Sequence, residues 1–249
     1  MLTGPKKLII LEQVDSTNNY AMAMVQNGVA NSGDAVFAHN QTAGKGRRMK
    51  AWESNPGENI ILTILSEMQW LPVPQQFRLS VAVSLACFHF FSNHIKENIK
   101  IKWPNDIFLR DRKAGGILIE NVIKGNLWQW AVIGIGLNIN QEIFDPENFA
   151  ATSLRRETGK KYDVIALAAE LHSQVINSIL RLQNESFHDV LQQYNQHLFR
   201  RNESVKLKKG NVAFETTIKS VSSLGDLITQ DVIERKFHFD EVEWQLNTR

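Results

Sequence analysis

Two short segments near the middle of the chain hold residue types that could do chemistry together. The run Lys102-Trp103-Pro104-Asn105-Asp106 supplies a cation, an indole, a rigid proline, an amide and a carboxylate. A few residues later, Lys113-Ala114-Gly115-Gly116 sets a second lysine beside two glycines, which let backbone approach a ligand closely. Each lysine alone is more typical of a protein surface, but the combination indicates a polar site rather than a packing pattern.

The segment from Gln41 to Lys50 is rich in glycine and in cations. It follows a strand-like run and has no apolar period, so we expect a loop. Backbone amides in such a turn, together with Lys and Arg side chains, can hold a phosphate or a carboxylate. A solvated basic loop is the alternative for this segment taken alone. The GxxxxGK[ST] nucleotide loop is excluded, because no Ser or Thr follows a Gly-Lys pair in the required frame.

Two other polar runs are explained more simply by local structure than by ligand binding. Asp15-Ser16-Thr17-Asn18 has the side chains of a helix cap, although a helix N-terminus also presents oriented donors to a ligand. The run Gly134 to Asn140 lacks the third glycine of a dinucleotide fingerprint, which argues against a Rossmann fold and favours a tight turn at a strand end. The seven His residues are scattered, so we predict no metal site built from them.

The elements that must position these segments alternate between strand-like and helical patterns. The expected strands are Leu8 to Leu11, Ala35 to Ala38, Asn59 to Leu65, Ile99 to Ile101, Gly116 to Val122 and Trp128 to Ile133. Helices are expected after Asn18 as far as Asn27, and at Phe77 to Phe91, Asp163 to Leu180 and Ser186 to His197. A mixed or antiparallel sheet with flanking helices follows, with Lys124-Gly125-Asn126 as a hairpin turn.

The pattern changes after Phe199. Short strand-like runs separated by polar turns predict a small barrel, and they lie at Val205 to Leu207, Phe214 to Ser220, Leu227 to Gln230 and Lys236 to Trp244. We therefore expect two domains, residues 1–199 and 200–249.

Composition limits which classes of protein the chain can belong to. A length of 249 residues allows a substantial core, and the single cysteine, Cys87, lies in an apolar run where a buried thiol is the expected state. The formal net charge of +2 does not indicate a polyanion binder. The N-terminal residues do not resemble a signal peptide, and no apolar run approaches the ~20 residues that span a bilayer. A soluble, cytoplasmic protein without a membrane segment is expected.

In their order along the chain, these segments resemble those of the biotin–protein ligases, also called biotin–[acetyl-CoA-carboxylase] ligases. The resemblance covers nearly the whole chain, and the pairing of Lys-Trp-Pro-Asn-Asp with Lys-Ala-Gly-Gly is specific. It implies an α+β fold, with a mixed sheet and flanking helices of the class II synthetase-like kind, followed by an SH3-like β-barrel. Some members carry an N-terminal DNA-binding domain, but fourteen residues before Asp15 are too few for it, so we expect no specific DNA binding.

The resemblance implies a reaction in two steps. Biotin and ATP would give biotinyl-5′-AMP, and the biotinyl group would then pass to a lysine of a biotin carboxyl carrier protein of acetyl-CoA carboxylase or a related carboxylase. Lys45, Arg47 and Lys113 match the catalytic cations. The matched biotin-binding residues are Ser16, Thr17, Asn18, Gln41, Lys45, Gly46, Arg47, Lys113, Gly115 and Gly116. The matched nucleotide-binding residues are Arg47, Arg48, Lys50, Trp52, Asn105, Asp106, Lys113 and Asn138.

The family's chemistry also implies Mg²⁺ bound with ATP, held mainly by phosphates and water because no metal cage is evident. Members often form homodimers through an exposed sheet. The basic loop departs from the family's Gly-Arg-Gly-Arg-Arg-Gly-Arg at Lys45, Met49 and Lys50; Met49 replaces a residue free to adopt positive φ. Two alternatives stay open: a lipoate–protein ligase with the same adenylate chemistry, and a nucleic-acid-binding protein using Lys45 to Lys50 and Lys206 to Lys209.

Overall fold

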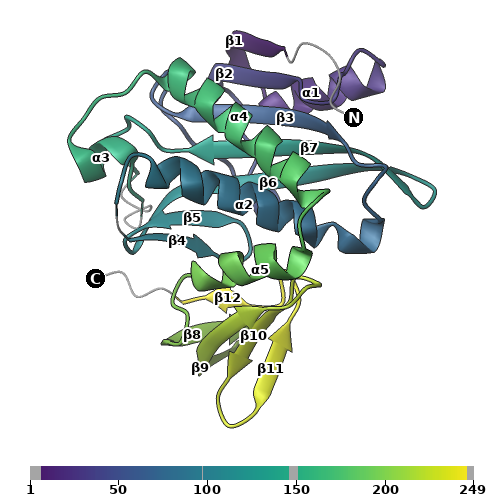
Figure 1. Cartoon of the computed structure of the whole chain (residues 1–249). Coiled ribbons are helices and arrows are strands. Elements are labelled where there is room, and N and C mark those ends of the chain that lie inside the picture. Colours follow the sequence, from purple (N-terminus) through teal and green to yellow (C-terminus); the bar gives the residue numbers. More distant parts are fainter. Residues whose placement is uncertain (1–6, 97, 146–150, 246–249) are drawn as a thin grey trace.

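The computed structural model describes residues 7–96, 98–145 and 151–245 of the chain, and within them two sheets account for every named strand (Figure 1). The larger sheet has the order β1-β2-β3-β7-β6-β5-β4. Its strands are β1 (Leu8–Val14), β2 (Ala35–Gln41), β3 (Ile60–Glu67), β4 (Ile99–Lys102), β5 (Asp106–Leu109), β6 (Arg112–Lys124) and β7 (Leu127–Leu137). Because β1 and β2 pair in parallel and the other neighbours are antiparallel, the predicted mixed sheet is confirmed.

Helices cover the large sheet unequally. The α-helices are α1 (Thr17–Gln26), α2 (Phe77–Ser92), α3 (Leu154–Thr158), α4 (Val164–Leu182) and α5 (Phe187–Gln196), with short 3₁₀ turns η1 (Arg47–Met49) and η2 (Val73–Gln75). Helices α2 and α4 cross one face of the sheet in Figure 1. On the other face, Ala21 of α1 packs with Val36, Leu65 and Val132 in a smaller cluster. Because α1 covers only part of this second face, a ligand-binding site can lie on it.

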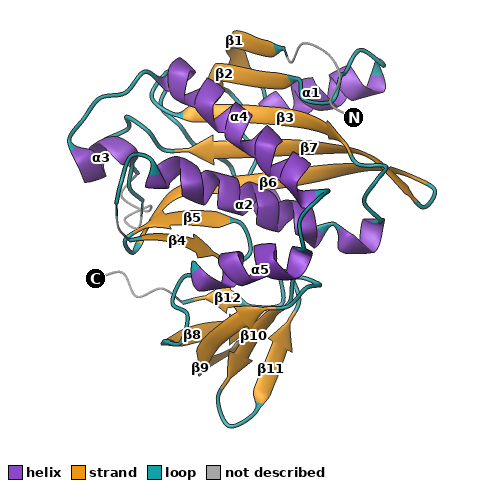
Figure 2. Ribbon diagram, viewed as in Figure 1, coloured by secondary structure: helices purple, strands orange, loops and turns teal. Residues whose placement is uncertain are grey.

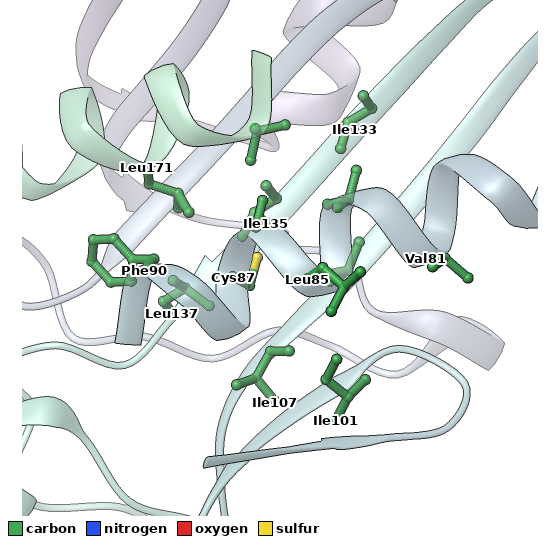
Figure 3. Close-up of a cluster of buried hydrophobic side chains, with 14 of the residues drawn as sticks. Val81, Leu85, Cys87, Phe90, Ile101, Ile107, Ile133, Ile135, Leu137 and Leu171 are labelled. Atoms are coloured by element: carbon green, nitrogen blue, oxygen red, sulfur yellow. The ribbon is translucent and has the colours of Figure 1, made fainter. Parts of the chain in front are cut away.

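The main core lies between the sheet and the helices α2 and α4. Alternate residues of β7 (Ile133, Ile135 and Leu137) point toward Leu85 and Cys87 of α2 (Figure 3). Strand periodicity puts their neighbours Gly134 and Gly136 on the opposite face. Cys87 is fully buried, which confirms the expected buried thiol, and burial raises the pKa of this thiol.

The C-terminal strands form a separate antiparallel sheet beyond α5 (Figure 2). Its order is β11-β10-β9-β8-β12, with β8 (Ser204–Lys209), β9 (Val212–Val221), β10 (Leu227–Gln230), β11 (Glu234–Phe237) and β12 (Glu243–Trp244). Such a sheet is consistent with the expected SH3-like barrel. The predicted strand Lys236 to Trp244 is wrong, because a turn at residues 238–242 divides it into β11 and β12. The boundary between residues 199 and 200 stays a prediction.

Four other elements differ from the expectation. Strand β5 and helix α3 were not predicted, because each is short and depends on partners distant in the sequence. The tight turn was expected in the run Gly134 to Asn140, but residues 134–137 are instead the last part of β7, and Lys113 lies inside β6 rather than before it. In the described part of the chain, no helix combines the length and the apolar character that a membrane crossing requires.

Candidate active site

A cavity with an empty volume of about 490 Å³ lies on the face of the large sheet opposite α2, at the N-terminus of α1. Strands β3, β6 and β7 form its floor, and the loop after β2 covers it. Of the residues predicted to bind ligand, the cavity brings together Ser16, Thr17, Asn18, Gln41, Lys45, Gly46, Arg47, Trp52, Asn105, Lys113 and Gly116. These residues come from segments far apart in the sequence, and the fold gathers them into one site.

One end of the cavity consists of uncharged polar side chains that hydrogen-bond to one another. The Thr17 backbone N–H and hydroxyl both donate to Gln41 Oε1, at 2.7 and 3.0 Å. Thr63 Oγ1 of β3 lies 2.8 Å from Thr17 Oγ1 and 2.6 Å from Asn18 Oδ1. Because Thr63 is fully buried and Thr17 and Asn18 nearly so, these groups have fixed directions. This polar end offers a ligand an ordered set of donors and acceptors.

The helix-cap prediction for this segment is only partly right. Helix α1 begins at Thr17 with Ser16 in the N-cap position, but the Ser16 side chain makes no capping hydrogen bond. Ser16 is buried and lines the cavity. A buried N-cap residue turned toward a cavity rather than toward its own helix suits ligand contact better than helix stabilisation.

Two glycines of β7 provide the space for this arrangement. A Cβ at Gly134 would overlap the Asn18 side chain, and a Cβ at Gly136 would overlap the Trp52 indole. Both glycines belong to the run that resembled a dinucleotide motif. Their role here is close approach of side chains to the sheet, not a turn before a helix.

Trp52 forms one wall of the cavity. Its indole lies against Gly136 and Gly116, and the Lys113 ammonium is 5.8 Å from the ring centroid. The indole Nε1 is buried and has no hydrogen-bond partner within the described residues. The wall is therefore an apolar surface, and its Nε1 donor faces the sheet at Gly136.

A chain of charges lies beside the cavity. Lys113 Nζ is 2.8 Å from Asp106 Oδ1, and Lys102 Nζ is 3.7 Å from Asp106 Oδ2. Burial lowers the pKa of Lys102, Asp106 opposes that shift and the Lys113 charge reinforces it. Asp106 thus holds two lysines, of which only Lys113 lines the cavity. Lys102 and Asp106 support this cation from behind.

The basic loop carries the cations at the other end of the cavity. The backbones of Lys45 and Ala51 form an isolated antiparallel β-bridge, and the Gly46 N–H donates to the Lys50 carbonyl at 2.7 Å. These two contacts close the loop around η1. Arg47 lines the cavity, where its Nη1 donates to Asn105 Oδ1 at 3.4 Å. The basic loop is therefore held by its own backbone and by the contact between Arg47 and Asn105.

The C-terminal sheet also contacts this loop. Arg47 Nη2 is 3.1 Å from Asp240 Oδ1, and its guanidinium lies 5.3 Å from the Phe239 ring centroid. Arg48, at φ +54°, turns away from the cavity and pairs with Asp240 (2.8 Å) and Glu243 (2.9 Å). Sequence reasoning missed this link between the basic loop and residues nearly two hundred positions later.

The remaining predicted site residues lie outside the cavity. Gly115 packs against Leu137 on the core face, Lys50 is exposed, and Arg48 and Asp106 serve the ion pairs described above. Asn138 is buried and donates from Nδ2 to the Thr152 carbonyl at 3.0 Å. No role was predicted for Thr63 or Glu120. For Thr63, the available signal was a polar residue inside an apolar run, whereas Glu120 stands beside Asn121 and is less conspicuous.

The cavity has a polar end and a cationic end and lies on one face of a mixed sheet. A small antiparallel sheet follows this mixed sheet along the chain, and the whole arrangement is the fold of a class of ligases. The family model described as "Biotin/lipoate A/B protein ligase family" matches residues 10–138. The chain belongs to this family.

Known relatives agree with this assignment. "Bifunctional ligase/repressor BirA" of Escherichia coli is 35% identical over 130 residues, or 52% of this chain and 40% of that protein. "Biotin--[acetyl-CoA-carboxylase] ligase" of Mycobacterium tuberculosis is 33% identical over 157 residues, or 61% and 56%. The matches thus span about half the length of these relatives. The structure of a biotin protein ligase from Aquifex aeolicus with biotin and ATP has the same fold, with a TM-score of 0.81, 22% identity and coverage of 97% and 100%.

Proposed function

We propose that this protein is a biotin–protein ligase. It would join biotin to ATP, forming biotinyl-5′-AMP and releasing pyrophosphate, and then transfer the biotinyl group to a lysine of a carboxylase carrier protein. The observation that carries this proposal is the cavity with one uncharged polar end and one cationic end. Biotin has the matching chemistry, since a ureido ring lies at one end of the molecule and a carboxylate at the other.

The uncharged polar end suits the ureido ring, which both donates and accepts hydrogen bonds. Ser16, Thr17, Asn18 and Gln41 supply complementary groups there without a net charge. A lipoyl group has no ureido ring, so these groups would lose hydrogen bonds with it. Unpaired buried polar groups reject a ligand strongly. This favours biotin over lipoate.

The cationic end addresses the main barrier of the first step. The biotin carboxylate must attack the α-phosphate of ATP, and these two anions repel each other. Lys45, Arg47 and Lys113 line the cavity where the carboxylate would lie, and they would stabilise the charge that develops on the phosphoryl oxygens. Trp52 would support the nucleotide through the face of its indole ring.

The second step needs access for the carrier's lysine. A neighbouring cavity, with an empty volume of about 720 Å³, shares Arg47 and Asn105 with the first and opens along β6. We assign it as the route of the incoming amine. The amine nitrogen would attack the acyl carbonyl of the adenylate, an amide bond would form, and AMP would leave with the bonding electrons as the amine loses a proton.

Mg²⁺ enters this proposal as the companion of ATP. The described residues contain no group of three or more His, Cys, Asp or Glu side chains that could hold a metal, and Asp106 is engaged by two lysines. The phosphates and water would therefore hold the ion, which would neutralise the departing pyrophosphate. A cytoplasmic location and a homodimer also belong to the proposal.

Biotin-dependent exchange of pyrophosphate into ATP tests the first step directly. We expect exchange with biotin and little with lipoate. Exchange with lipoate but not biotin would replace the proposal by the lipoate–protein ligase. A steeply salt-dependent DNA affinity, with no exchange, would instead favour the nucleic-acid-binding alternative.

A further inference from the structure

Glu120 of β6 contacts both ends of the cavity, yet no role was predicted for it and the proposed mechanism does not use it. Residues two apart in a strand share a face, so Glu120 lies on the same face as Gly116 and Leu118, which line the cavity. Its Oε2 accepts a hydrogen bond from Asn18 Nδ2 at 2.7 Å. Its Oε1 is 4.0 Å from Lys45 Nζ.

The contact with Asn18 determines which way an amide points. A carboxylate only accepts hydrogen bonds, so Glu120 requires the NH₂ group of Asn18 to face it. The Asn18 carbonyl oxygen then faces Thr63, whose hydroxyl is 2.6 Å away and can donate to it. Glu120 thereby sets the direction of the hydrogen bond between Thr63 and Asn18 at the polar end.

The contact with Lys45 is of a different kind. The two charges are 4.0 Å apart, and the side chains are 44% and 33% exposed, so the attraction is weak. A ligand carboxylate beside Lys45 would compete with Glu120 for the same ammonium. The weak pair keeps Lys45 near the cavity and gives way easily.

We propose that Glu120 is a positioning residue that couples the two ends of the cavity. It orients the Asn18 amide for the ureido ring, and it holds Lys45 at the cavity until the ligand's carboxylate takes over that cation. This inference rests on the proposed function, because it assumes that biotin occupies the cavity.

Two substitutions separate the two contacts. Glu120→Gln keeps a carbonyl oxygen that can accept from Asn18, but it removes the negative charge that competes for Lys45. Glu120→Ala removes both contacts. Glu67, an exposed glutamate at the end of β3, provides matched controls as Glu67→Gln and Glu67→Ala.

We expect Glu120→Ala to raise the KM for biotin about tenfold and to change kcat less than threefold, because the lost contacts act on binding rather than on the chemical step. Glu120→Gln should restore KM to within about threefold of wild type. A purely structural role would instead lower the thermal unfolding temperature of both variants without this split between KM and kcat. The Glu67 variants should match wild type throughout.

Calorimetric titration with biotin and with biotinol, in which an alcohol replaces the carboxylate, isolates the Lys45 contact. Glu120→Gln should favour biotin over biotinol by about twofold to threefold more than wild type does. Unchanged biotin affinity in Glu120→Ala, or equal damage in both Glu120 variants, would overturn the inference while leaving the ligase assignment intact. A wild-type protein that binds no biotin would overturn the proposed function and this inference with it.

Discussion

The two ends of the cavity are built in opposite ways. At the polar end, Thr17, Asn18 and Thr63 are buried and joined to one another by short hydrogen bonds between uncharged groups. At the cationic end, Arg47 is held by an exposed carboxylate, Asp240, which lies in the turn between β11 and β12. One end is prepared by the core, and the other depends on charges that water and salt can screen.

The difference teaches which parts of the site must be preorganised. A neutral ring gains little from long-range attraction, so its recognition depends on groups that already point in the right directions. The anions of biotin and ATP carry full charges and can draw a cation from a weak partner. The carboxylates paired with Arg47 and Lys45 can therefore be replaced by the anions of the ligand. The hydrogen bonds of Thr63, in contrast, form a fixed frame.

Replacing Lys113 should have the largest effect, because this cation would face the charge that develops in the transition state. We expect Lys113→Ala to slow pyrophosphate exchange by about 10²-fold or more. The fold should survive, since Asp106 keeps Lys102 as a partner. Lys124→Ala, at the far end of β6, is the control and should behave as wild type. Near-normal exchange in Lys113→Ala would refute the role assigned to this residue.

Arg47 offers the next largest effect and tests the replaceable character of the cationic end. Arg47→Gly should release the adenylate about tenfold faster, because the anionic phosphate loses a charge-assisted partner. Arg47→Lys keeps the charge but loses the bidentate fork, so this variant should release the adenylate at a rate between those of the wild type and Arg47→Gly. Retention of labelled adenylate on the purified protein measures all three rates. Identical retention would mean that Arg47 serves the contact with Asp240 rather than the ligand.

Thr63 tests the fixed frame. Thr63→Val removes a buried hydroxyl and leaves Asn18 Oδ1 without this partner, which should cost ~1–3 kcal/mol of stability and raise the KM for biotin about tenfold. Thr229→Val is a matched control, because the Thr229 hydroxyl is buried without a hydrogen-bond partner in the part of the chain that is described. Urea unfolding and steady-state kinetics distinguish them. Equal effects of the two substitutions would show that the Thr63 hydroxyl has no special role.

The sequence predicted elements well where the determinants are local. Asp163 accepts hydrogen bonds from the backbone N–H groups of Ile165 and Ala166, so the expected start of α4 is confirmed by an ordinary cap. Strand β5 was missed because its four residues, Asp106–Leu109, become a strand only through pairing with β4 and β6. Such pairing is a property of the fold and leaves little trace in a short window.

The site follows the same rule. The cations of the basic loop stood out because they cluster in the sequence, and the cavity brings Lys45 and Arg47 together with Lys113. Glu120 and Asp240 did not stand out, since each gains its meaning from a partner more than seventy positions away. The residues that support ligand-binding groups are therefore harder to predict than the ligand-binding groups themselves.

The smallest expected effect comes from the ion pair between Arg48 and Asp240, which belongs to the cationic end but lies outside the cavity. A double-mutant cycle with Arg48→Ala and Asp240→Ala should give a coupling free energy of ~0.2–1 kcal/mol, because the Asp240 side chain is 53% exposed. Added salt should reduce that value. A salt-independent coupling above ~2 kcal/mol, well beyond the range for exposed pairs, would mean that the two ends of the cavity are equally rigid. In that case the anions of the ligand could not displace the partners of the cationic end, and the contrast between the two ends would fail.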